Sequence, residues 1–199
     1  DEPRGVAGNR NMRVMHIVGE RYGALFGTSF KRDANGAIVH ENSAGYPQPV
    51  IDTNRKILGF GVAPTQLGIG TSVRYKNWNA SLLIEGKNGG QIMSGSNAEM
   101  LGRGLHKMTV PAGGRESGFV PDGVMEDGSA ISASLNTAQQ QNYWNKYNDA
   151  AEASIYDADY MRLRNIIIGY SLPSSMLEGS SIQSATISLI GKNLFCLSN

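Results

Sequence analysis

The feature that most constrains this chain is a pair of alternating segments at residues 67–86. Apolar and β-branched residues occupy every second position, first as Leu67, Ile69, Thr71, Val73 and Tyr75 and then as Trp78, Ala80, Leu82 and Ile84. The positions between them are mostly small, polar or charged. A period of two places each set on its own face of a β-strand, so the pattern predicts an antiparallel hairpin with a turn at Lys76-Asn77.

The same hairpin fits two classes of protein. At roughly 3.3 Å per residue, each strand is long enough to cross an outer-membrane hydrocarbon layer when tilted. Tyr75 and Trp78 flank the turn, where interfacial aromatic residues are expected in such a strand pair. A half-buried hairpin of a β-sandwich shows the same period. Gly68 and Gly70 favour the membrane barrel, because glycine weakens a sandwich strand.

Composition excludes several other kinds of protein and site. No apolar run reaches the length of a transmembrane helix. The net charge of +1 provides no basic field, so we expect no nucleic acid partner. Cys196 is the single cysteine, which excludes an internal disulfide and matches no zinc spacing. The first residues carry no signal-peptide pattern, so we expect the chain to begin inside a longer or processed protein.

Shorter extended pieces precede the hairpin. Residues 12–18 and 22–32 are predicted strands, and Asp33-Ala-Asn-Gly36 is predicted to form a tight turn because Asn-Gly supplies positive φ angles. A calcium loop can open with the same residues, but the remaining ligands are missing. Residues 37–40 would form the return strand and residues 45–49 a polar connection.

The alternating pattern disappears between residues 91 and 155, where Gly, Ser, Asn, Gln and Asp dominate. A stretch of this length is either a functional loop or disordered, and residues 136–153 could form a short polar helix or a turn within it. Tyr143, Trp144 and Tyr147 are the candidate substrate-binding residues, because exposed aromatic rings stack on sugars or fill peptide pockets. The alternative is that they only attach the loop to the barrel rim.

Strand character returns at residue 156. The apolar set changes parity at Arg164-Asn165, which predicts a β-bulge. Pro173 should end this strand, residues 174–179 should turn, and residues 185–195 alternate again.

These segments resemble one known family. Residues 155–173 (IYDADYMRLRNIIIGYSLP) resemble the "YDASYVRLRNVTLGYTLP" signature near the C-terminal end of SusC/RagA-type TonB-dependent transporters, and residues 185–195 (ATISLIGKNLF) resemble the strand that follows. Further family elements match in the same order: residues 22–27, 57–59, 67–92, 114–118 and 122–124. Residues 60–64 depart from the family pattern, and Asp159 replaces a small residue.

The resemblance implies an all-β fold in which the antiparallel strands form part of a barrel of about 22 strands. Residues 1–199 would be the C-terminal portion, with residues 91–155 as one long extracellular loop. The plug and the TonB-contact segment would precede Asp1. Arg162, Arg164, Arg74 and Glu85 would face the lumen, since a lipid-facing arginine at mid-depth costs roughly 2–4 kcal/mol.

The resemblance also implies a function. Such transporters import glycans or peptides across the outer membrane of a Gram-negative, Bacteroidetes-type cell, with TonB and a SusD-like surface lipoprotein as partners. We expect no enzymatic activity, cofactor or metal: His16, His40 and His106 lie far apart, and no nucleophile elbow occurs. The alternative function is a secreted or surface β-sandwich that binds carbohydrate or mediates adhesion.

Overall fold

The computed structural model describes residues 5–9 and 11–198. The chain forms two compact units. The sheet unit contains Ala63–Gly90 and Asp157–Asn199, and the mixed unit contains Asp1–Val62 and Gln91–Tyr156. The mixed unit is therefore partly an insertion between two halves of the sheet unit. No helix in the described residues is long and apolar enough to span a membrane.

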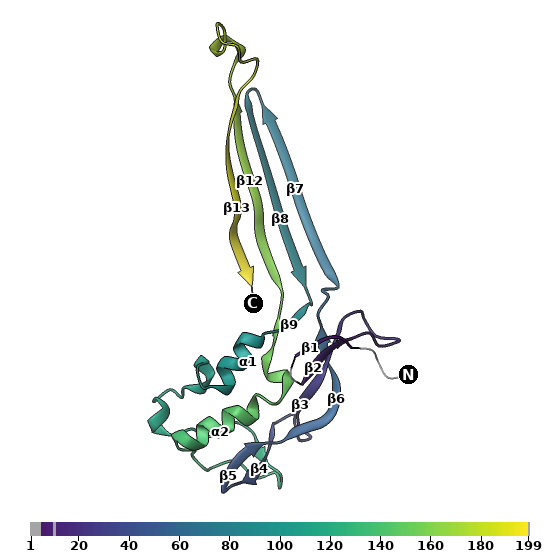
Figure 1. Ribbon diagram of the computed structural model, residues 1–199, viewed down its shortest axis with the longest axis vertical. Coiled ribbons are helices and arrows are strands. Elements are labelled where there is room, and N and C mark those ends of the chain that lie inside the picture. Colours follow the sequence, from purple (N-terminus) through teal and green to yellow (C-terminus); the bar gives the residue numbers. More distant parts are fainter. Residues whose placement is uncertain (1–4, 10, 199) are drawn as a thin grey trace. The chain divides into compact units, whose positions relative to one another are not determined.

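The sheet unit is one antiparallel sheet of four long strands. These are β7 (Thr65–Tyr75), β8 (Trp78–Asn88), β12 (Tyr160–Ser171) and β13 (Thr186–Ser198), arranged in the order β13-β12-β8-β7 (Figure 1). The pairs of β7 and β8 run from Thr65 opposite Asn88 to Tyr75 opposite Trp78, which confirms the predicted hairpin. Lys76 takes a φ of 53° in the two-residue turn.

A bulge interrupts β12 where the sequence predicts it. The register shifts between Leu163 and Asn165 against both neighbours, β8 and β13. The extra residue returns the apolar side chains of the second half of the strand to the face occupied by those of the first half. A short helical turn, η4 (Ser174–Met176), follows Pro173 and agrees with the predicted turn.

The mixed unit contains three small sheets. The strands β1 (Gly5–Asn9), β2 (Met12–Met15), β3 (Ala24–Phe30) and β6 (Ile51–Phe60) form the largest, in that order. A second sheet joins β4 (Val39–Ser43) to β5 (Tyr46–Pro49) and to β10 (Val124–Met125), and a third pairs β9 (Gln91–Met93) with β11 (Ile155–Asp157).

The predicted early strands are present but shorter, and two predictions are corrected. Residues 45–49 form strand β5 rather than a connection, because they pair with β4 from His40–Pro49 to Ser43–Tyr46. The sequence pattern did not predict strand β6, because its first half is polar and shows no apolar alternation. The turn at Asp33 is confirmed: its carboxylate accepts the amides of Asn35 and Ala37 at 2.9 and 2.8 Å. Within that turn only Gly36 has a positive φ.

Residues 91–155 are more ordered than the sequence indicates. They contain α1 (Gly95–Gly102), α2 (Thr137–Tyr147) and the 3₁₀ turns η1 (Lys107–Thr109), η2 (Arg115–Ser117) and η3 (Ala151–Ser154). The predicted polar helix is α2, which begins with a reciprocal capping box between Asn136 and Gln139. The sequence did not indicate α1 or the 3₁₀ turns, because polar helices lack the apolar periodicity used to detect them.

The core of the mixed unit explains this order. Leu101, Leu135, Tyr143 and Trp144 form one buried cluster, against which Phe119 and Tyr147 pack. Tyr143 and Trp144 meet edge to face, with ring centroids 5.1 Å apart. A second cluster joins Met12, Leu25 and Ala151, and so links residues far apart in the chain.

Candidate functional site

The sheet unit has one continuous apolar face. The cross-strand register aligns the apolar sets of all four strands: Leu67, Ile69, Val73 and Tyr75 of β7; Trp78, Ala80, Leu82 and Ile84 of β8; Met161, Leu163, Ile166, Ile168 and Tyr170 of β12; Ile187, Leu189, Phe195 and Leu197 of β13. Many of these side chains are exposed, Leu189 at 74% and Ile187 at 67%. A patch of this size marks an interaction or membrane surface.

The opposite face is charged. Register places Arg74, Lys87, Arg162 and Lys192 on it, together with the carboxylate of Glu85. Arg164, at the bulge, reaches the same carboxylate. Leu83, Ile167 and Ile190 are the apolar members of this face. The predicted separation of the charged residues from the apolar set is thus confirmed in the geometry of the sheet.

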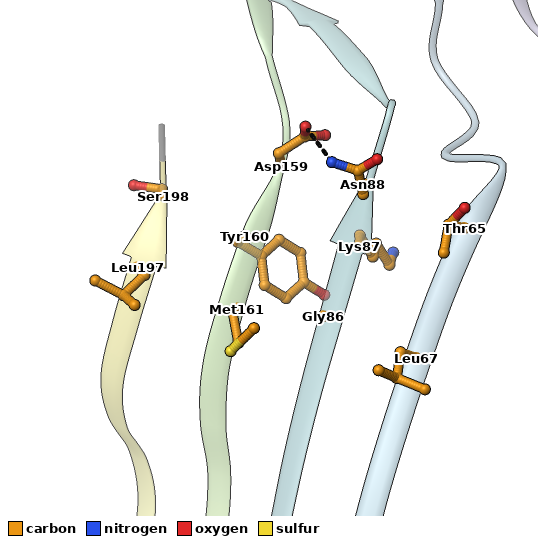
Figure 2. Close-up of a pocket in the computed structure, with 10 residues that line it drawn as sticks. All are labelled: Thr65, Leu67, Gly86, Lys87, Asn88, Asp159, Tyr160, Met161, Leu197 and Ser198. Carbon is orange, nitrogen blue, oxygen red and sulfur yellow. Dashed lines mark hydrogen bonds between the residues drawn. The ribbon is translucent and has the colours of Figure 1, made fainter.

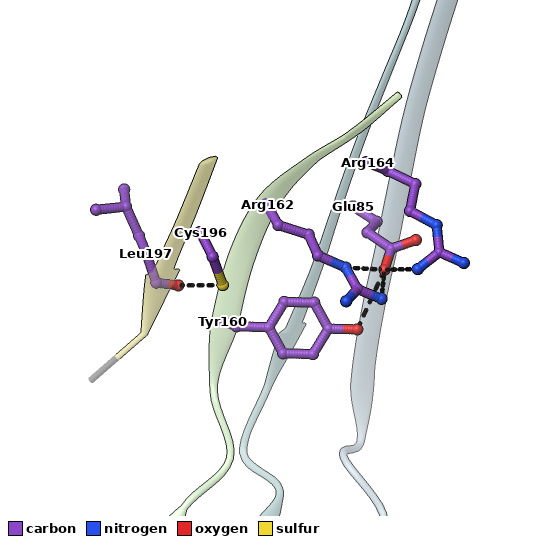
Figure 3. Close-up of polar contacts among 6 residues, drawn as sticks. All are labelled: Glu85, Tyr160, Arg162, Arg164, Cys196 and Leu197. Atoms are coloured by element: carbon purple, nitrogen blue, oxygen red, sulfur yellow. Dashed lines mark hydrogen bonds and ion pairs between the residues drawn. The ribbon is translucent and has the colours of Figure 1, made fainter. Parts of the chain in front are cut away.

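Glu85 is the centre of the charged face. Its carboxylate accepts hydrogen bonds from Nε and Nη2 of Arg162, from Nη1 of Arg164 at 3.5 Å, and from the hydroxyl of Tyr160 at 3.3 Å (Figure 3). The Tyr160 ring lies 4.8 Å from the Arg162 guanidinium and 6.0 Å from the Lys87 ammonium. One carboxylate therefore orients two arginines, and one aromatic ring lies close to two cations.

A groove of about 390 Å³ passes over this cluster. It is lined by Gln66, Leu67, Gly68, Glu85, Gly86, Lys87, Tyr160, Arg162 and Arg164. Gly68 lies opposite Glu85, and a Cβ placed on it would have no heavy atom within 4 Å. The glycine therefore leaves the approach to the carboxylate and its arginines open.

A second hollow, of about 520 Å³, forms where the strands end (Figure 2). Leu67, Met161 and Leu197 surround Gly86, which has no side chain to fill the space between them. Asp159 closes the rim: its carboxylate accepts the amides of Gly89 and Gly90 at 2.7 and 3.3 Å and Nδ2 of Asn88 at 3.0 Å. This residue, which departs from the family pattern, joins the end of β8 to the start of β12.

The three aromatic residues proposed to bind substrate lie in the mixed unit. Tyr143 and Trp144 are buried, at 2% and 4% exposure, and Tyr147 is half-buried against Phe30. Burial raises the pKa of the Tyr143 and Tyr147 hydroxyls. The assumption that these rings are exposed is wrong for Tyr143 and Trp144, because both serve as core side chains of α2. The alternative, that the three rings attach the loop to the barrel rim, stays a prediction.

His40 belongs to the same core, a placement that sequence spacing alone does not reveal. It is fully buried; its Nδ1–H donates to the Ile38 carbonyl at 3.1 Å, so that Nε2 accepts from the Tyr143 hydroxyl at 3.2 Å. Burial lowers the pKa of His40 below 6.5. Among the described residues, no group of three His, Cys, Asp or Glu side chains is arranged to hold a metal ion.

Comparison with known proteins gives a consistent result. The chain is 24% identical over 192 residues to "TonB-dependent receptor P3" of Formosa agariphila, a match that covers 88% of this chain and 18% of that protein. The chain thus spans about a fifth of the length of this curated relative. No family model matches.

Solved structures with the same fold include two of the RagAB system. The peptide importer in the open-open state aligns over 99% of this chain and 24% of that chain, with a TM-score of 0.54 and 10% identity. The RagAB peptide transporter aligns over 96% of this chain and 20% of that chain, with a TM-score of 0.51 and 12% identity. The predicted resemblance to TonB-dependent receptors is confirmed, and the chain shares the fold of the matching part of the RagAB structures. The curated relative is named as a receptor, and the two solved structures are named as a peptide importer and a peptide transporter.

Proposed function

We propose that this chain is the C-terminal portion of a TonB-dependent outer-membrane importer of glycans or peptides. In this role β7, β8, β12 and β13 are neighbouring strands of the transmembrane barrel. The observation that carries the proposal is the sheet with an exposed apolar face opposite a charged face. That distribution suits lipid on one side and a water-filled lumen on the other.

The connections of the sheet support the same orientation. The β7–β8 hairpin turns in two residues, and β12 joins β13 at the same end of the sheet (Figure 1). The long insertion of residues 91–155 leaves from the other end. Outer-membrane barrels have short periplasmic turns and long extracellular loops, so we place the insertion outside the cell.

The two edge strands of the sheet need further strands as pairing partners. Within the described residues, β7 and β13 each have one paired neighbour in the sheet. An unpaired strand edge in lipid leaves backbone groups unsatisfied at a cost of several kcal/mol each, so both edges need barrel partners. Family resemblance supplies the size of about 22 strands and the partners: TonB and a SusD-like surface lipoprotein.

The β-sandwich alternative predicts a different environment for the apolar face. In a sandwich this face would be buried against a second sheet about 10 Å away. Val73, Ile187 and Leu189 are instead more than half exposed. Lipid is the cover that matches both the exposure and the length of the strands.

Cysteine labelling in intact outer membranes tests the proposal. Ile187 and Ser188 are adjacent in β13 but lie on opposite faces, so they form a matched pair. In a background carrying Cys196→Ser, we expect Ser188→Cys to react with a membrane-impermeant maleimide and Ile187→Cys to react only after denaturation. Equal labelling of the two in the native membrane would contradict the lipid-and-lumen assignment.

A further inference from the structure

The groove around Glu85 has an excess of positive charge. Its lining includes the cations of Lys87, Arg162 and Arg164 and the single carboxylate of Glu85. Cations gathered on the wall of a lumen raise the local concentration of anionic groups and guide them inward.

The arginines of the groove are held in place. Arg162 is bound to Glu85 through two nitrogens and is restricted further by the Tyr160 ring. Arg164 uses one terminal nitrogen on the same carboxylate and is 46% exposed. A guanidinium has five N–H donors in a fixed fork, so orientation by one carboxylate leaves donors to offer a second one.

The groove is also open to a ligand. Gly68 on β7 presents no side chain above the cluster, and a Cβ placed on it would have no heavy atom within 4 Å. A larger residue at position 68 would stand directly opposite Glu85. A glycine in a strand interior is often found where a ligand or another backbone approaches the strand closely, and Gly68 fits that pattern.

We propose that this groove binds a carboxylate group of the transported substrate, so that the importer prefers acidic over neutral oligomers. The inference rests on the proposed function, because it requires the charged face to line the lumen. Arg164 and Lys87 would contact the incoming carboxylate, and Glu85 would be a positioning residue that fixes the two arginines.

Binding to the full-length receptor in detergent tests this substrate preference. The probes are hexaglutamate and hexagalacturonate, each compared with a neutral counterpart, hexaglutamine and maltohexaose. We expect at least one acidic probe to bind more tightly than its neutral counterpart and Arg164→Gln to weaken that binding about tenfold, the usual scale for one charge-assisted hydrogen bond. Preferential binding of hexaglutamate would indicate that the carboxylate belongs to a peptide, and preferential binding of hexagalacturonate that it belongs to a glycan.

Two further variants distinguish a specific loss of binding from a folding defect. Lys87→Gln removes charge from the groove without touching Glu85 and should also weaken the acidic probe. Arg74→Gln removes the same charge from the same face outside the groove and should leave binding unchanged. Equal affinity for acidic and neutral probes, or no response to Arg164→Gln and Lys87→Gln, would overturn the proposal.

Cys196 offers a second measurement that needs no substrate. It is exposed, and its position in β13 pairs with Arg162 in β12. With thiosulfonate reagents of matched size, we expect an anionic sulfonate to react several-fold faster than a cationic trimethylammonium, and Arg164→Gln to reduce that ratio. Equal rates for the two reagents would contradict an electropositive groove. Equal labelling of Ile187→Cys and Ser188→Cys in the native membrane would instead contradict the proposed function itself.

Discussion

The two units of this chain use apolar residues in opposite ways. In the described residues, every buried apolar side chain of the core belongs to the mixed unit, including Leu135, Tyr143 and Trp144. The sheet unit has apolar residues just as large, yet Ile187, Leu189 and Phe195 are more than half exposed. The mixed unit buries its own apolar surface, whereas the sheet unit presents its apolar surface to the surroundings.

This difference shows what each unit needs in order to fold. The mixed unit gains stability from contacts between its own side chains, as a water-soluble domain does. The sheet unit is held by antiparallel pairing along its four strands, and under the proposed function lipid covers its apolar face. Substitutions in the core of the mixed unit should therefore change its own folding stability. Substitutions on the apolar face of the sheet unit should instead change how well that face is accommodated by the medium around it.

The largest expected effect is in the core of the mixed unit. Trp144→Ala removes a buried ring that packs against Tyr143 and Phe119, so we expect a loss of about 3–5 kcal/mol in the free energy of unfolding of this unit. Protease resistance of residues 91–156 in the full-length protein measures it. Leu189→Ala, at an exposed site of the sheet unit, is the control and should leave that resistance unchanged.

The second effect separates the two faces of the sheet. Ile187→Arg places a charge on the apolar face and should cost roughly 2–4 kcal/mol in lipid, which lowers the amount of assembled barrel in the outer membrane. Ser188→Arg adds the same side chain to the charged face and should assemble normally. If Ile187→Arg assembles as well as Ser188→Arg, the apolar face does not contact lipid.

A smaller effect is expected at the junction between β8 and β12. Asp159→Ala removes the acceptor of the Gly89 and Gly90 amides and of the Asn88 side chain, at a cost of about 1–2 kcal/mol. Hydrogen exchange at the two glycine amides should accelerate, while exchange in the middle of β12 stays slow. Unchanged exchange at both amides would show that Asp159 does not hold this junction.

The smallest effect is a dependence on pH that is confined to the mixed unit. Because burial lowers the pKa of His40 below 6.5, the unfolded chain binds more protons than the folded chain between the two pKa values. The contribution of His40 is complete above pH 6.5 and is lost as the pH falls toward the folded pKa, with a slope of at most about 1.4 kcal/mol per pH unit.

Proteolysis of the mixed unit between pH 7.5 and 5 measures this slope. Replacement of His40 by Gln should flatten it, whereas replacement of the exposed His16 by Gln should leave it unchanged. An identical slope in the His40 variant would assign the pH dependence to another group.

The amount that could be predicted from sequence differs between the units. The β7–β8 hairpin, the bulge at Leu163–Asn165 and the division of charged from apolar residues follow from a period of two and from one change of parity. In the mixed unit, β6 and β5 were missed, and the order within residues 91–155 was underestimated. Those elements pair or pack with distant residues, and polar sequences leave little periodicity to detect.

The sequence by itself determined which side chains share a face of the sheet, because alternation along a strand is a local property of the backbone. Only the tertiary structure decided what lies across from each side chain. The register between β8 and β12 brings Arg162 and Arg164 to Glu85, and the fold of the mixed unit buries Tyr143 and Trp144 rather than exposing them. Contacts between residues that are distant in the chain depend on register and packing, which no local pattern encodes.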